Sequence, residues 1–152
     1  MKFFTSFYQN IKNIPDDYKL VSISGDIPEY IQNRVDIWDK RFAPNYSLFS
    51  EYKSSPEGKA REEQYIKRFK SEVLPKYDIT QILKDWSDKC GLNEKYVLLC
   101  YEVPGDFCHR HIVSEAISQK YNVEVPEIGI DSSKIMEGYR FIDNLNFDED
   151  EW

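Results

Sequence analysis

The feature that most constrains this chain is an apolar segment at residues 96–101, which reads Tyr-Val-Leu-Leu-Cys-Tyr. A strand that is apolar on both faces is usually central and covered by helices, as in parallel sheets. Pro104-Gly105-Asp106 follows as a tight turn, with Asp106 placed to cap a helix over about residues 107–120. We therefore expect a single Rossmann-like α/β domain with a small, mostly parallel sheet flanked by helices.

Further elements follow from local patterns. Residues 2–6 and 18–24 are rich in aromatic and β-branched side chains and predict two strands. Apolar residues at helical spacing predict one helix from Lys59 that ends before Pro75. A second helix is predicted to begin at Asp78 and to end before Gly91.

The remaining segments give weaker patterns. Pro28 and Pro44 interrupt residues 27–52, where we expect a short helix, a loop and then a second short helix at about 47–53. Later in the chain the patterns predict one short strand at 123–125 or 128–130, a weak helix over 132–144 and an acidic tail at 148–152.

The length of 152 residues fits one domain, which we place at residues 1–130, with residues 131–152 as a C-terminal extension. The net charge of -7 argues against generic nucleic-acid binding. No apolar stretch reaches the roughly 18 residues of a membrane span, and no signal-peptide pattern opens the chain. A cytoplasmic protein without membrane contact is expected, and the oligomeric state stays open. The three cysteines are expected to be reduced thiols.

The candidate site is the segment Cys108-His109-Arg110-His111, at the start of the helix predicted after the apolar strand. A helix N-terminus stabilises an anion, and neighbouring basic side chains favour a thiolate, so Cys108 is the candidate nucleophile. Helical spacing places Cys108 and His109 toward the sheet and Arg110 where it could reach an anion. For His111 we favour a structural role.

Ligands of parallel α/β domains collect outside the carboxyl ends of the strands. That rule would bring further polar side chains around Cys108 as ligand-binding residues: Thr5, Ser6, Ser22, Ser24, Tyr101 and Glu102. The preferred hypothesis is a cysteine-dependent hydrolase or transferase acting on a nucleotide or another anionic small molecule. In it Cys108 attacks, His109 adjusts protonation, Arg110 binds the anion and Glu102 acts as acid or base.

Three other interpretations stay open. The chain could bind a nucleotide or nucleobase, or a partner protein, without catalysis. Cys108 and His111, with Cys100 or Glu102, could form a zinc site, although this spacing is no known zinc signature. Cys108 could also be a small buried apolar residue, with Arg110 paired to Glu102. The chain has no Gly-rich phosphate loop, no Gly-x-Ser-x-Gly elbow and no two-cysteine redox motif, and we predict no cofactor.

Residues 98–111 also carry a resemblance, since a Leu-Leu-Cys-Tyr-Glu strand end is followed by Cys-His-Arg at a helix start. This pattern resembles the domain-of-unknown-function 488 family, and the likeness extends over roughly residues 2–130. It implies one α/β domain with the Cys-His-Arg motif beside the pocket, and no established activity. Many relatives have Gly-His-Ser after the first strand, where this chain has Thr5-Ser6-Phe7, so no histidine role carries over there.

Overall fold

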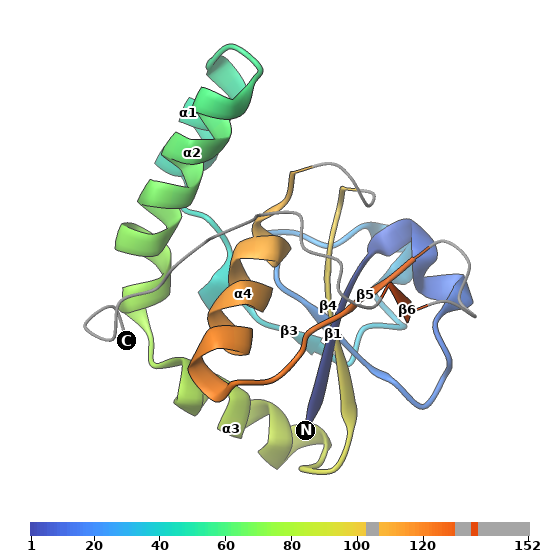
Figure 1. Ribbon diagram of the computed structural model, residues 1–152. Coiled ribbons are helices and arrows are strands. Elements are labelled where there is room, and N and C mark those ends of the chain that lie inside the picture. Colours follow the sequence, from blue (N-terminus) through green and yellow to red (C-terminus); the bar gives the residue numbers. More distant parts are fainter. Residues whose placement is uncertain (103–106, 130–134, 137–152) are drawn as a thin grey trace.

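A computed structural model describes residues 1–102, 107–129 and 135–136 of the chain. The strands of this described part form one sheet in the order β3-β2-β4-β1-β5-β6 (Figure 1). Their bounds are β1 Lys2–Phe7, β2 Lys19–Ser22, β3 Ile37–Trp38, β4 Lys95–Cys100, β5 Glu127–Ile128 and β6 Ile135–Met136. Strands β1 to β5 pair in parallel, and β6 pairs antiparallel with β5.

Strand β4 is central, as its sequence predicts. It pairs with β1 on one side and with β2 on the other, and its residues from Tyr96 to Cys100 are buried. Its side chains alternate between two cores: Tyr96 and Leu98 belong to one cluster, and Val97 and Leu99 to the other. Both faces of the sheet are therefore covered, which explains the uninterrupted apolar run.

Helices of different kinds cover the two faces. The first core includes side chains from α2, α3 and α4, and the second includes side chains from the 3-10 turns η1 and η2. Helices α1 and α2 extend away from the sheet side by side (Figure 1). The bounds are η1 Tyr8–Asn13, η2 Glu29–Ile31, η3 Lys40–Phe42, α1 Tyr46–Ser54, α2 Lys59–Arg68, a π-helical turn Phe69–Val73, a 3-10 turn Leu74–Lys76, α3 Ile79–Cys90 and α4 His109–Tyr121.

The single α/β domain and its mostly parallel sheet are confirmed. The start of α3 is also as predicted, since the Asp78 side chain accepts a hydrogen bond from the backbone N–H of Thr80. At its end Gly91 takes a positive φ of 118°, which glycine adopts without steric cost. The helix that begins at Lys59 passes into π and 3-10 geometry, and Pro75 lies within the 3-10 turn.

Several local predictions were wrong. Residues 27–52 contain two 3-10 turns and the short strand β3 before α1, in place of the first short helix. Helix α4 begins at His109 with Cys108 as its N-cap residue, so Cys108 lies just before the helix. Ile135–Met136 is a strand within the segment predicted as weakly helical. The Pro104-Gly105-Asp106 turn, the acidic tail and the rest of residues 132–144 lie outside the described residues.

Within the described residues, no helix is both long and apolar enough to cross a membrane.

Candidate functional site

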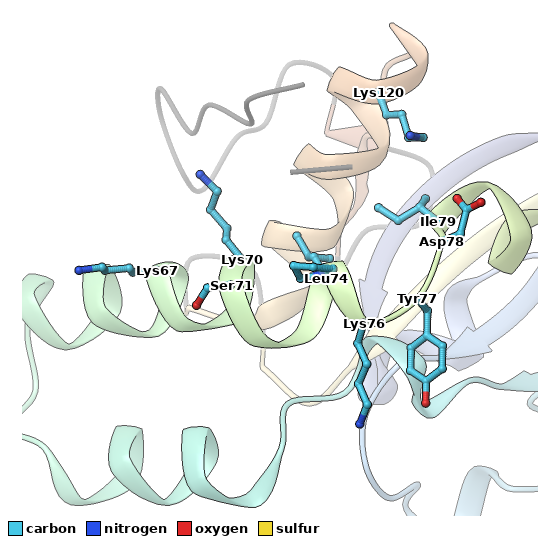
Figure 2. A pocket seen from close by; sticks show the side chains of 10 residues that line it. Lys67, Lys70, Ser71, Leu74, Lys76, Tyr77, Asp78, Ile79 and Lys120 are labelled. Atoms are coloured by element: carbon cyan, nitrogen blue, oxygen red, sulfur yellow. The ribbon is translucent and has the colours of Figure 1, made fainter. Parts of the chain in front are cut away.

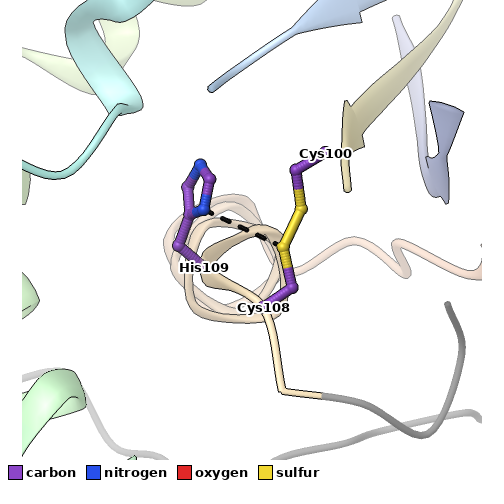
Figure 3. Close-up of side chains that lie close together, drawn as sticks. All are labelled: Cys100, Cys108 and His109. Carbon is purple, nitrogen blue, oxygen red and sulfur yellow. Dashed lines mark hydrogen bonds between the residues drawn. A yellow bond between two sulfur atoms is a disulfide. The ribbon is translucent and has the colours of Figure 1, made fainter. Parts of the chain in front are cut away.

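The site lies where β4 ends and α4 begins, at the carboxyl edge of the sheet. Cys100 is the last residue of β4, and Cys108 is the N-cap of α4. Their Sγ atoms are joined in a disulfide, as Figure 3 shows. The expectation of three reduced cysteines was therefore wrong for this pair, and Cys90 is the free, half-buried thiol. The end of β4 and the start of α4 meet at one edge of the sheet and bring together two cysteines that are eight residues apart in sequence.

His109 lies beside this disulfide and has a fixed tautomer. Its Nε2 lies 2.7 Å from the backbone carbonyl oxygen of Ile23, just beyond β2. A carbonyl oxygen only accepts hydrogen bonds, so Nε2 carries the proton and donates it. The unprotonated Nδ1 then faces the Sγ of Cys108 at 3.8 Å (Figure 3). The imidazole is thus oriented to take a proton from the Cys108 thiol once the disulfide is reduced.

The imidazole of His109 is held neutral. Burial, with a smaller contribution from the positive charge of Arg110, lowers its pKa from 6.5 to about 4, and the hydrogen bond to Ile23 partly opposes this shift. A neutral ring keeps the Nδ1 lone pair free to accept a proton at neutral pH. Cys108 and His109 therefore start as an uncharged pair, in contrast to the thiolate beside positive charges that the sequence suggested.

A pocket of about 340 Å³ opens onto these residues. It reaches Cys100, Cys108 and His109, and its wall includes the aromatic side chains of Tyr46, Phe49, Tyr52, Tyr65, Tyr101 and Phe107. Its described lining includes two acids, Asp26 and Glu102, and one base, Lys53. A concave, mostly apolar pocket with a few polar groups and one strongly shifted pKa is the usual form of a small-molecule site.

Arg110 occupies a different position from the one expected. It is fully buried, and its Nε and Nη2 atoms donate to the two carboxylate oxygens of Glu127 at 2.9 and 3.0 Å. Its Nη1 donates to the backbone carbonyl of Glu102 at 2.6 Å and lies 3.4 Å from the Sγ of Cys100. This placement argues against the predicted anion-binding role, because a buried carboxylate already neutralises the guanidinium.

The predicted ligand-binding residues are divided between the pocket and the core. Ser24, Tyr101 and Glu102 line the pocket. The other three are buried within strands: Thr5 and Ser6 in β1 and Ser22 in β2. The hydroxyl of Ser6 donates a hydrogen bond to the backbone carbonyl of Ile128 within the core. Those of Ser22 and Ser24 both contact the hydroxyl of Tyr8.

The cluster that could hold a metal differs from the predicted one. Among the described residues, three potential ligand atoms lie within 4.8 Å of one another, one each from Cys100, Cys108 and His109. His111 is not part of this group, although it lies in the first turn of α4. Two thiolates and an imidazole are typical zinc ligands. The zinc alternative from the sequence combined Cys108 and His111 with Cys100 or Glu102, whereas the structure places His109, and not His111, beside the two cysteines.

Sequence reasoning missed the aromatic wall and the partner of Arg110. Tyr46, Phe49 and Tyr52 recur every three residues, a spacing that places them near one another on a helix and could have indicated a shared face. Cys100 had been named only as an alternative zinc ligand, although it ends the strand that leads into the motif. Nothing in the spacing of Arg110 and Glu127 indicates that they pair across 17 residues.

A larger cavity, of about 650 Å³, lies elsewhere. Its lysines come from the end of α2, the turns that follow and the end of α4: Lys67, Lys70, Lys76 and Lys120 (Figure 2). It holds neither cysteine nor histidine, and it lies at the opposite end of α4 from His109, about 16 Å along the helix axis. We therefore take the smaller pocket, where Cys100, Cys108 and His109 meet, as the candidate functional site.

These features define a class of protein: a single parallel α/β domain with a cysteine–histidine pocket at the carboxyl edge of its sheet. Within that class, residues 11–121 match the model of the family DUF488-N3a, described as the active DUF488-N3 subclade. The match covers well over half of the chain, so the chain belongs to this DUF488 family. No curated protein and no solved structure matches it.

Proposed function

We propose that this protein is a cysteine-dependent enzyme, a hydrolase or transferase, in which Cys108 is the nucleophile and His109 the general base. The observation that carries the proposal is the orientation of His109, whose Nδ1 faces the Cys108 Sγ at 3.8 Å while Nε2 is held by Ile23. A nucleophile, a base and a group that orients the base form the arrangement used for covalent catalysis. In the preferred reading the substrate is a nucleotide or a related small molecule.

The reaction would begin with the reduced pair. The Cys108 thiol passes its proton to His109 Nδ1, and the sulfur attacks an electrophilic carbon of the substrate, so that an S–C bond forms and the bond to the leaving group breaks. The leaving group departs with the proton from Nδ1. Water or an acceptor hydroxyl then attacks the same carbon and releases the thiol, while its own proton passes through Nδ1 to Cys108. Glu102, which also lines the pocket, is the candidate second acid or base.

Alkylation tests this proposal. After reduction, iodoacetamide at neutral pH should modify Cys108 at least about tenfold faster than Cys90, whose thiol has a pKa raised by burial. His109→Gln, which removes the proton acceptor, should slow the modification of Cys108 and leave that of Cys90 unchanged. Peptide mass spectrometry over time gives the rate at each cysteine, and Cys100→Ser frees Cys108 without a reductant.

Three results would contradict the proposal. Equal and slow labelling of Cys90 and Cys108 would mean that Cys108 is not activated. About one zinc per chain in reduced, purified protein would mean that the thiols are metal ligands. A Cys108→Ser variant that retains full activity in the cell would favour binding without catalysis.

A further inference from the structure

The wall of the pocket beside Cys108 is a continuous set of aromatic rings. Tyr52 lies 5.2 Å from Tyr65 and 5.6 Å from Phe107 between ring centroids, and Tyr65 lies 5.3 Å from Phe107. Phe69 extends this set to His109, with ring centroids 5.8 Å apart. Clustered aromatic side chains of this kind bind another ring by stacking or edge-to-face contact.

The mouth of the pocket is aromatic as well. Tyr46 and Phe49 of α1 line it and are 83 % and 47 % exposed, and Tyr101, which follows β4, is 43 % exposed. Aromatic side chains in a wall are commonly buried, whereas these three remain open to solvent at the entrance. Exposed rings around a hollow bind planar groups such as nucleobases by stacking.

The charges of the pocket disfavour an anion. Among the described lining residues, Asp26 and Glu102 are acidic and Lys53 is basic, and Arg110 is neutralised by Glu127 outside the pocket. The acidic residues also affect tyrosines of the pocket wall. Burial and the contact with Asp26 raise the pKa of Tyr101 to about 12. Burial and the charge of Glu102 likewise raise the pKa of Tyr65. Phosphate here would meet two carboxylates, whereas a cationic or N–H-rich ring would be attracted to them.

We propose that the pocket takes a neutral or cationic nitrogen heterocycle, such as a nucleobase, ring first, with any phosphate left outside. The juxtaposition of six aromatic side chains with Asp26 and Glu102 around Cys108 carries this inference. It rests on the proposed function in one respect, because the ring then presents its reacting carbon to the Cys108 sulfur. It also changes the expected substrate, since the anionic group is no longer what the site recognises.

Binding to the full chain carrying Cys108→Ser tests the inference without turnover. The probes are adenosine, 1-methyladenosine (whose ring is cationic at neutral pH), adenosine 5′-monophosphate, inorganic phosphate and choline, each titrated calorimetrically. We expect both nucleosides to bind, 1-methyladenosine at least as tightly as adenosine, and the monophosphate no more tightly than adenosine. Choline tests whether a cation without a ring suffices, and we expect it to bind at least tenfold more weakly than 1-methyladenosine.

Matched variants locate the binding. Phe49→Ala should weaken nucleoside binding about tenfold, whereas Tyr77→Ala, which removes an equally exposed ring outside the pocket, should not. Glu102→Gln should reduce the preference for 1-methyladenosine over adenosine, and Asp88→Asn on the exposed face of α3 should leave it unchanged.

Three results would overturn the inference. The first is that the monophosphate or inorganic phosphate binds more tightly than adenosine. The others are choline binding as tight as that of 1-methyladenosine, and no binding of either nucleoside. Cys108 could still pass the alkylation test in each case, so failure of the substrate class and failure of the nucleophile are distinguishable.

Discussion

His109 makes the stability of the fold depend on pH, because the folded protein keeps its ring uncharged. The ring is buried, and burial lowers its pKa from 6.5 to about 4. Above pH 6.5 the folded and unfolded states both hold a neutral ring. Between pH 6.5 and about 4 only the unfolded state binds the proton, so stability falls as the pH falls.

This pH dependence is a testable prediction. The shift corresponds to about 3 kcal/mol of unfolding free energy lost between pH 6.5 and 4. His109→Gln keeps an amide that can donate to Ile23 and cannot be protonated, so the variant should lose less stability over this range. Urea unfolding at several pH values measures the difference.

The buried His111 provides the control. The His111→Gln variant still contains His109. Between pH 6.5 and 4 it should therefore lose more stability than the His109→Gln variant, by the same amount as the wild type does. Parallel curves for the wild type and His109→Gln from pH 7 to pH 4 would refute the assignment.

At the level of elements, the Arg110–Glu127 pair joins α4 to β5. Both side chains are fully buried, and the two parallel hydrogen bonds of 2.9 and 3.0 Å fix the helix start against the edge of the sheet. Arg110 also donates a hydrogen bond to the backbone carbonyl of Glu102. This bond fixes the backbone that carries two residues of the pocket lining, Tyr101 and Glu102. We therefore interpret Arg110 as a positioning residue, which supports the site without touching the substrate.

A double-mutant cycle tests that interpretation. Arg110→Met should cost about 3–5 kcal/mol of stability, because it leaves the Glu127 carboxylate buried without a counter-charge. Combining it with Glu127→Leu should recover much of the loss, since two apolar side chains then face each other. Chemical denaturation of the two single variants and the double variant gives the coupling energy.

An exposed pair serves as the comparison. Lys84 and Asp88 lie one turn apart on the surface of α3, and Lys84→Met should change stability little. A small coupling energy for Arg110 and Glu127, similar to that of the surface pair, would show that the buried contact does not hold α4 against β5.

At the level of the whole molecule, the pattern of apolar residues predicted the central strand of the sheet. The run at residues 96–101 has no polar position, and only a central parallel strand buries both faces, so the fold class followed directly. The strand β3 was missed because two residues carry no periodic pattern, and Pro28 and Pro44 on either side of it pointed to loops. Its pairing with β2 depends on tertiary contacts.

The site was predictable only in part. Cys108 and His109 could be found because a helix start beside a central strand end has known chemistry. The disulfide, the bond from His109 to Ile23 and the pairing of Arg110 with Glu127 depend on elements that are distant in sequence. The anion-binding role was assigned to Arg110 from local sequence, which does not reveal whether a distant carboxylate neutralises a guanidinium.

The Arg110–Glu127 pair also determines where this chain can be divided. The family match ends at residue 121, whereas the carboxylate that neutralises Arg110 lies at position 127 in β5. A fragment cut at the end of the match would retain the buried guanidinium and lose its counter-charge, along with the strand that pairs with β1 at Thr5. The family match thus ends before the residues that complete the buried pair and the sheet, and we expect a stable fragment to extend at least through Ile128.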